Sequence, residues 1–364
     1  MSASTRLEVS TAALTHNYQY LRSQLDPSTQ FMAVVKANAY GTDLVKLSKC
    51  LDELGADSFC VAYVEEGLAL REAKITKPIL VLHAQLDTLE SGVEAGLDFS
   101  LYSVAFTKAL AETALALERK TAVHINLNTG LNRLGIKSSE LDEMLQLIEG
   151  NPQLQCEWMM THLAASEDAG LRAFTLEQIE QFNAQHRKVS ERLGKPVKRH
   201  VLNSSGVHNY PEAAFECVRS GISLHGYAND PLIDKKLIPI SSLYSSISAI
   251  RNIEAGESVS YNRQFIAQKP MRIATVGIGH GDGIHRSLGT TDFKVLVNHQ
   301  EASAVGMICM DLFMIDVTGL KAEVGDTVLL FGPAQSAETL SSQAETIAYE
   351  LITGIGPRVP RVFV

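Results

Sequence analysis

A lysine at the end of an apolar run is the first residue whose setting suggests covalent chemistry. Lys36 closes the run FMAVVK, and Tyr40 follows in the same short loop. An amine held in a dry, enclosed place loses part of its charge and becomes a better nucleophile. A strand-end lysine that extends into solvent is the alternative interpretation of this position alone. Lys36 is therefore a candidate nucleophile, with the Tyr40 hydroxyl nearby.

Other candidate residues also follow apolar runs. Arg133 lies between two glycines in NTGLNRLG, where a guanidinium suits an anion. His162 ends QCEWMMTH, although a single histidine there is more often structural than catalytic. The segments LNSSG and VRSGI bring small polar side chains and glycine close to an arginine, which favours phosphate binding. Their candidate residues are Asn203, Ser204, Ser205, Arg219 and Gly221.

The spacing of the apolar runs predicts the elements that carry these residues. Eight runs are typical of strands: 31–36, 58–62, 78–83, 98–102, 122–127, 155–162, 198–203 and 215–219. Amphipathic stretches between them predict helices, such as 11–25 after the N-cap Ser10, 43–55 ending at Gly55, and 173–194. Eight strands alternating with helices predict an α/β fold, a (β/α)8 barrel over residues 1–235. A doubly wound open sheet is the alternative.

Beyond residue 235 the helical periodicity fades. The β-rich runs at 241–250, 271–278, 293–298, 312–317 and 326–331 predict a mostly-β second domain over 236–364. One late helix is expected over 340–352. In a barrel the residues that follow the strands meet at one mouth, so the candidates above should converge there.

Composition excludes several classes of function. The chain has 364 residues and a net charge of −9, which argues against nucleic acid as its main partner. The five cysteines include no CxxC pair, and His280 and His285 have no convergent ligands, so no disulfide framework and no metal are expected. No signal peptide or membrane span is visible, and we expect a cytoplasmic protein.

A phosphate site together with a nucleophilic lysine indicates a particular cofactor. Pyridoxal 5'-phosphate has an aldehyde for the amine, a phosphate for the last two strand-end loops and a ring nitrogen. The sequence therefore predicts this cofactor at the barrel mouth.

The same segments resemble a known family. AVVKANAYG is similar to the pyridoxal-lysine motif of alanine racemases, which are fold-type III pyridoxal-phosphate enzymes. Further similar segments follow in order, namely NTGLNRLG, THLAASED, LNSSG, VRSGI, ESVSYNRQF, GIGHGDG, VGMICMDLFMIDVT and YELITGIGPRVPR. The lysine motif is shared with fold-type III decarboxylases, whereas VGMICMD and RVPR are more specific to the racemases.

The resemblance implies two catalytic bases. Lys36 would hold the cofactor as a Schiff base and act on one face of the substrate α-carbon. Tyr261, in SVSYNR, would act on the opposite face and would come from the partner subunit. The backbone at Met310 would contact the substrate carboxylate from that subunit. A homodimer with shared sites is thus implied.

The resemblance also implies how the cofactor is held. Tyr40 and Ser204 would bind its phosphate, with the backbone of Gly221 and Ile222 beside them. Arg219 would face the pyridine nitrogen.

Two further residues would lie around the ring. Arg133 would neutralise charge near the cofactor phenolate and the substrate carboxylate. His162 would lie beside the ring and orient Arg219 or Tyr261.

Four positions depart from the common family pattern. Asn126 stands where many members carry a carbamylated lysine, and Asn128 where many have aspartate. His280 replaces a frequent tyrosine at the substrate entrance. Pro357 replaces a tyrosine that supports the second base, so Tyr261 would lose that hydroxyl partner.

The function expected from all of this is interconversion of L- and D-alanine, supplying D-alanine for peptidoglycan. Racemisation of serine or lysine is one alternative, and decarboxylation by a fold-type III enzyme is another. A decarboxylase would be expected to show a GPxCDxxD-type segment, which MICMDLF does not match. A non-enzymatic pyridoxal-phosphate carrier, resembling the barrel half alone, and a barrel without cofactor are the remaining alternatives.

Overall fold

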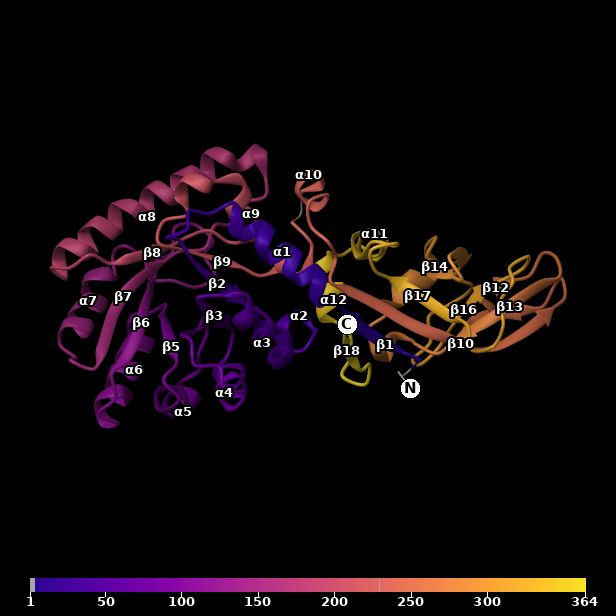
Figure 1. The fold of residues 1–364 in the computed structure, drawn as a ribbon, viewed down its shortest axis with the longest axis horizontal. Helices are drawn as coiled ribbons and strands as arrows, with labels where there is room; N and C mark the ends of the chain where they lie inside the picture. Colours follow the sequence, from indigo (N-terminus) through magenta and orange to yellow (C-terminus); the bar gives the residue numbers. More distant parts are fainter. Residues whose placement is uncertain (1–3, 229) are drawn as a thin grey trace.

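The computed structural model describes residues 4–228 and 230–364. The molecule is elongated and has two parts, a barrel formed by the earlier residues and a β-rich part formed by the later ones (Figure 1). Helices α1 (Thr11–Ser23) and α12 (Ala348–Thr353) lie between the two parts. The predicted fold class, a (β/α)8 barrel followed by a mostly-β domain, is confirmed.

The first part is built on parallel strands in the order β8-β7-β6-β5-β4-β3-β2-β9. Their bounds are β2 (Gln30–Val34), β3 (Ser58–Val61), β4 (Ile79–Val81), β5 (Asp98–Leu101), β6 (Thr121–Asn126), β7 (Leu154–Met160), β8 (Lys198–His200) and β9 (Cys217–Ser220). The backbone N–H of Arg219 donates to the Leu202 carbonyl at 3.0 Å and brings the two edges together. The eight predicted strands are therefore present, and they curve into a nearly closed barrel rather than an open sheet.

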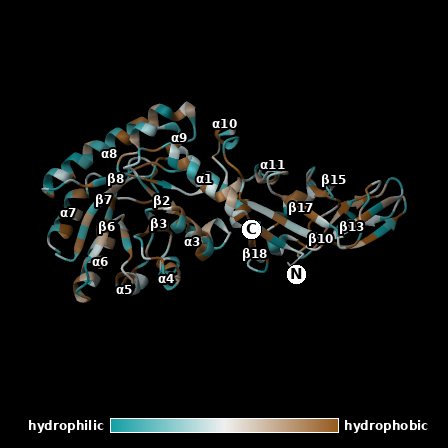
Figure 2. Ribbon diagram, viewed as in Figure 1, coloured by the Kyte–Doolittle hydropathy of each residue, from teal (hydrophilic) through white to brown (hydrophobic). Residues whose placement is uncertain are grey.

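Helices cover the outside of this barrel (Figure 1). They are α3 (Leu44–Leu54), α4 (Val64–Glu72), α5 (Leu89–Glu94), α6 (Val104–Ala116), α7 (Leu141–Glu149), α8 (Arg172–Arg192) and α9 (Ser204–Asn209). Ser10 caps α1 by accepting from the Ala13 N–H, and Gly55 ends α3 with a φ of 99°, both as predicted. Figure 2 shows hydrophilic residues along much of α8, whose other face packs on the barrel.

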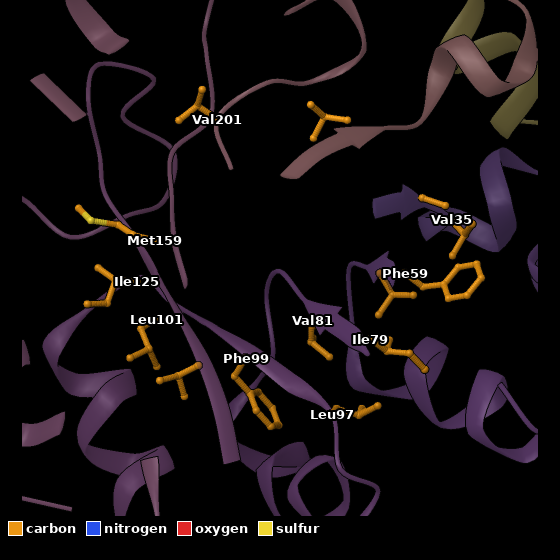
Figure 3. Close-up of a cluster of buried hydrophobic side chains, with 14 of the residues drawn as sticks. Val35, Phe59, Ile79, Val81, Leu97, Phe99, Leu101, Ile125, Met159 and Val201 are labelled. Atoms are coloured by element: carbon orange, nitrogen blue, oxygen red, sulfur yellow. The ribbon is translucent and has the colours of Figure 1, made fainter. Parts of the chain in front are cut away.

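Strand residues alternate between two apolar cores. Side chains on the outer face, such as Phe59, Phe99 and Ile125, pack against the helices (Figure 3). Met32 and Cys60 point inward and join a small cluster inside the barrel. This alternation is the two-residue period of a strand buried on both faces.

The second part is a mostly antiparallel sheet. Its strands are β1 (Arg6–Val9), β10 (Ser241–Ile253), β13 (Met271–Val276), β14 (Lys294–Val297), β15 (Gln300–Ser303), β16 (Phe313–Asp316), β17 (Thr327–Phe331) and β18 (Arg361–Phe363), with β11 (Ser258–Val259) and β12 (Phe265–Ile266) as a separate hairpin. Residues 6–9, for which no strand was predicted, fall within the expected barrel domain of 1–235 but form β1, which pairs with β10 and β18. The chain therefore begins in the second sheet before it enters the barrel.

The single late helix expected over 340–352 is two helices, α11 (Ala337–Gln343) and α12. Glu345 has a φ of 58°, and this left-handed residue interrupts the helical hydrogen-bond pattern. Helix α10 (Pro231–Asp234) lies on the connection between the two parts. Short 3-10 turns are η1 (Leu86–Thr88), η2 (Ala169–Leu171), η3 (Pro211–Ala213), η4 (Ile222–His225), η5 (Tyr261–Arg263), η6 (His280–Asp282) and η7 (Arg286–Thr290). Within the described ranges, no helix has the length and apolar character needed to cross a membrane.

Candidate active site

A cavity of about 450 Å³ opens at the ends of the barrel strands. The inward side of β2 carries Met32 and Val34, and the same two-residue step places Lys36 at the cavity wall. The predicted barrel residues that line this cavity are Lys36, Tyr40, Arg133, His162, Asn203, Ser204, Arg219, Gly221 and Ile222. The convergence expected from the strand ends is thus present.

The lysine loop, α2 (Lys36–Tyr40), is a left-handed turn. Ala37, Asn38, Ala39 and Tyr40 all have φ between 50° and 55°, a conformation that costs about 1–2 kcal/mol for each non-glycine residue. The Glu66 carboxylate offsets this cost by accepting from the Ala37 N–H at 2.6 Å with one oxygen and from the Ala62 N–H at 2.8 Å with the other. Sequence reasoning missed Glu66, because a helical glutamate 30 positions after the lysine carries no motif of its own.

Tyr40 and Gly221 fit together closely. Tyr40 is buried, and a Cβ added at Gly221 would lie 2.1 Å from its hydroxyl oxygen. The Ser204 hydroxyl accepts from the Gly221 N–H at 3.0 Å. Asn203 serves as the N-cap of α9, where its side chain accepts from the Gly206 N–H at 2.9 Å. Together these residues form a small polar cradle that has room for a ligand only because position 221 has no side chain.

Burial raises the pKa of Tyr40, and Tyr349 and Cys60 act in the same direction. The Tyr40 hydroxyl therefore stays protonated at neutral pH and remains a hydrogen-bond donor toward the cavity.

Arg219 is a buried cation held by neutral acceptors. Its guanidinium donates to the carbonyls of His200 at 2.6 Å and Thr161 at 2.8 Å, and to the His200 Nδ1 at 2.8 Å. The His162 Nδ1 is 3.4 Å from the Arg219 Nη2. Burial lowers the pKa of Arg219, and the described residues place no carboxylate within ion-pair distance of it.

His162 is neutral at physiological pH. Burial, together with the nearby charges of Arg219, Arg133 and Lys36, lowers its pKa to about 3. It therefore accepts hydrogen bonds inside the cavity without adding charge.

The Arg133 loop is held by asparagines rather than by charges. The Asn128 side chain accepts from the N–H groups of Gly130 and Asn132, each at 3.1 Å. Arg133 itself makes no hydrogen bond or ion pair with residues 4–228 or 230–364, and Asn126 lies buried in the cavity wall.

The charge balance of the cavity favours an anionic ligand. Lys36, Arg133 and Arg219 line it, and Glu167 is the only carboxylate among its described lining residues. In the part of the chain that the structure describes, no three His, Cys, Asp or Glu side chains gather in a group that could hold a metal ion.

Tyr261 and Met310 do not lie in this cavity. Tyr261 belongs to η5, beside β12 at the far end of the second part, whereas α2 lies near the middle of the molecule (Figure 1). Tyr261 is 66% exposed and lines a separate pocket of about 370 Å³ with Cys309 and Met314. A single chain therefore does not bring its own Tyr261 to its own Lys36.

The loop that contains Met310 is held by contacts with the HGDG turn at residues 280–283 and with Arg358. The Gly281 N–H donates to the Met310 carbonyl at 2.8 Å. Arg358 bridges Asp282 at 2.5 Å and Asp311 at 2.6 Å. The motif RVPR was recognised, but the role of Arg358 was not, because its partners are far away in sequence. His280 and Pro357 both lie at the exposed surface beside this loop.

Comparison with known proteins agrees with this geometry. Residues 9–229 match the family model "Alanine racemase, N-terminal domain", and residues 240–363 match "Alanine racemase, C-terminal domain". The chain belongs to the alanine racemase family. The match to both domains separates it from proteins that resemble the barrel alone.

Curated relatives and solved structures extend over the whole chain. Alanine racemase 2 of Caldanaerobacter subterraneus is 33% identical and covers 99% of this chain and 95% of its own length. The alanine racemase of Citrifermentans bemidjiense is 34% identical, with 100% and 99% covered. The structure of alanine racemase from Bacillus anthracis with bound L-Ala-P has a TM-score of 0.93 at 31% identity, with 100% and 96% covered. That from Clostridium difficile 630 has a TM-score of 0.94 at 29% identity, again with 100% and 96% covered.

Proposed function

We propose that this chain is a pyridoxal-phosphate-dependent isomerase that interconverts L- and D-alanine with one base on each face of the α-carbon. The observation that carries the proposal is the cavity in which Lys36, Arg219 and the Tyr40–Gly221 cradle meet, within a fold whose two domains both match alanine racemases.

The residues present fit pyridoxal phosphate. The cradle of Tyr40, Ser204 and Gly221 suits a phosphate, because it offers hydroxyl groups in a space that a Cβ would fill. Arg219 presents a buried donor for a ring nitrogen, and Lys36 presents an amine for an aldehyde. The positive balance of the cavity matches a phosphorylated ligand.

When bound, this cofactor supplies an electron sink for the α-carbon of an amino acid. The Lys36 Nζ would move a proton at one face of that carbon, and the Tyr261 hydroxyl would move one at the other. Two opposed bases invert the centre without turning the substrate over. Arg133 would hold negative charge near the site, and the Met310 backbone would meet the substrate carboxylate.

Arg219 would influence which reaction follows removal of the α-proton. A guanidinium remains protonated, so it donates a hydrogen bond to a ring nitrogen and does not transfer its proton. By leaving that nitrogen unprotonated, Arg219 would limit the electron withdrawal available at the site, which would favour return of the proton over transamination.

We further propose a homodimer with two shared sites. Tyr261, Met310 and Leu312 are 66%, 60% and 40% exposed in the single chain, and exposed apolar groups of this kind typically mark an interface. In a head-to-tail dimer, each β-rich part would cover the partner's barrel mouth and exclude water from it. The product D-alanine would supply peptidoglycan synthesis in the cytoplasm, as the family resemblance implies.

Two measurements test the proposed function. Purified protein loaded with pyridoxal phosphate should absorb near ~420 nm, and borohydride should fix the group to Lys36. It should interconvert L- and D-alanine faster than L-serine or L-lysine, and Lys36→Ala should abolish this activity. A protein that stays colourless after loading would contradict the proposed cofactor. A protein that racemises lysine fastest would contradict the proposed substrate.

A further inference from the structure

Behind Arg219, a row of buried polar side chains crosses the barrel interior. The His200 Nδ1 lies 2.8 Å from Arg219, and the His200 Nε2 lies 2.8 Å from the His124 Nδ1. The His124 Nε2 has no hydrogen-bond partner among the described residues, and the Asp98 carboxylate oxygen that it faces is 3.7 Å away. Both imidazoles are almost completely buried, with 0% and 1% of their surfaces exposed. The row therefore runs by two hydrogen bonds from the cavity wall to an imidazole nitrogen that faces a carboxylate without bonding to it.

The strands set this row in order. His200 ends β8, His124 lies within β6, and Asp98 begins β5. The register pairs His200 with Met160 and His124 with Ser100, two residues beyond Asp98. Because the barrel strands are parallel, the row descends from the mouth toward the opposite rim.

Arg219 fixes the direction of both hydrogen bonds in the row. A guanidinium only donates, so the His200 Nδ1 must accept, and the His200 proton must be on Nε2. That proton is donated to the His124 Nδ1, which leaves the His124 proton on Nε2, facing Asp98. Burial, together with Arg219 and His124, lowers the pKa of His200 far below its usual range, which agrees with a neutral ring.

The other charged groups near the row are engaged elsewhere. Arg71 is close to Asp98 but donates to the carbonyls of Ala95, Gly96, Ile75 and Lys77. The Trp158 ring stacks on His124 at 5.7 Å and separates it from the Lys198 ammonium, which lies 5.1 Å from the indole. Asp98 is thus the carboxylate to which the row leads.

We propose that His200 and His124 are positioning residues that fix the orientation of Arg219 and link it to Asp98 as a remote counter-charge. Polarised hydrogen bonds carry part of the stabilisation of a buried cation, because each neutral ring aligns its dipole with the next. The existence of this row is inferred from the contacts within the protein alone. Its effect on a bound pyridine ring rests, in addition, on the proposed function. In that role the two histidines would hold the Arg219 guanidinium in one orientation, as a weak hydrogen-bond donor to the ring nitrogen.

The tautomers can be read without any cofactor. Nitrogen-15 NMR of the histidine rings in the cofactor-free protein at neutral pH should show His200 and His124 as neutral Nε2–H tautomers, with resonances assigned by loss in His200→Asn and His124→Asn. A proton on the His200 Nδ1, or a cationic ring at either position, would contradict the proposed hydrogen-bond directions and with them the proposal. This result stands or falls independently of cofactor binding.

The energetic link is tested by a double-mutant cycle in the loaded enzyme. Asp98→Asn removes the charge, and His200→Asn keeps an acceptor for Arg219, whereas its shorter amide no longer reaches the His124 Nδ1 as the distal ring nitrogen does. Each should lower kcat about tenfold, a usual effect for groups that orient a catalytic residue, and leave the KM for alanine unchanged. Asp142→Asn, at an exposed carboxylate on α7, should change neither.

The double variant Asp98→Asn/His200→Asn should be no slower than either single variant, because both break the same row. If the losses of kcat in the two single variants multiplied in the double variant, the proposed link between Asp98 and Arg219 would be wrong. The same would follow if Asp98→Asn had the same kcat as Asp142→Asn. If the wild-type protein fails to bind pyridoxal phosphate, the proposed function fails instead, and the NMR result still decides the row.

Discussion

The hydroxyl of Tyr40 occupies the space that a side chain at position 221 would need, since a Cβ there would lie 2.1 Å from its oxygen. The contact joins the lysine loop after β2 to the turn after β9, and these segments are neighbours because the first and last strands of the barrel pair in parallel. The phosphate cradle thus depends on this pairing and on the absence of one methyl group.

Gly221→Ala should weaken cofactor binding by displacing Tyr40. The carbon would be far inside van der Waals contact, and overpacking of this kind costs about 1–3 kcal/mol, so we expect the dissociation constant for pyridoxal phosphate to rise about tenfold or more. Fluorescence titration of the cofactor-free protein measures this directly. Gly150→Ala, at the exposed end of α7 where the backbone φ of −75° suits an alanine, is the control. Unchanged affinity in Gly221→Ala would contradict the cradle.

Glu66→Ala should relax the left-handed lysine loop. The variant removes the acceptor for the Ala37 and Ala62 N–H groups, which should lower the free energy of unfolding by about 1–3 kcal/mol and reduce Schiff-base formation at Lys36. Urea titration and the ~420 nm band report the two effects. Glu65→Ala changes an exposed neighbour on the same helix and should leave both unaltered. Equal behaviour of the two variants would rule out the clamp.

The protein should lose stability in mild acid. Burial lowers the pKa of His225 to about 3, whereas an unfolded histidine titrates near ~6.5. The unfolded state therefore binds a proton first, so stability is complete above ~6.5 and falls as the pH drops toward 3, by up to about 1.4 kcal/mol per pH unit for each such group.

His225→Phe should reduce that slope by about one group's share, because phenylalanine does not titrate. Its ring keeps the tilted contact with Tyr40, whose ring centroid is 4.7 Å away. Urea midpoints between pH 7 and 5 provide the measurement. His16→Gln, at an exposed position on α1, should leave the slope unchanged. The same slope in wild type and His225→Phe would show that His225 is not the buried neutral group described here.

Arg358→Ala should loosen the Met310 loop. The arginine bridges Asp282 and Asp311, so its removal frees the backbone that would meet the substrate carboxylate. We expect the KM for alanine to rise about tenfold, as for a lost charge-assisted hydrogen bond, with a smaller change in kcat. Steady-state kinetics in both directions separate the two constants, and an effect on kcat alone would contradict a binding role.

The sequence predicted the barrel and its mouth because both follow from local patterns. Strand alternation placed Lys36 just beyond the end of β2, and the same logic placed Ser204 after β8 and Arg219 near the end of β9. The break between α11 and α12 was harder to predict. It occurs at Glu345, which has a left-handed backbone conformation that a glutamate side chain does not favour.

Long-range partners could not be predicted in this way. Strand β1 has an ordinary alternating pattern, and only its pairing with β10 and β18 shows which sheet it joins. Glu66, His200 and Asp98 act through residues far away in the chain, and none of them belongs to a local motif. The positions of Tyr261 and Met310 relative to a second subunit remain predictions.

Subunit complementation tests most directly whether each site needs two chains. Lys36→Ala and Tyr261→Phe homodimers should both be nearly inactive, the second by about 10²–10⁴-fold. After the two are unfolded together and refolded at equal amounts, half of the dimers should be mixed, and each mixed dimer regains one intact site. The expected activity is about one quarter of wild type. No recovery, with mixed dimers demonstrated by mass spectrometry, would contradict the shared site.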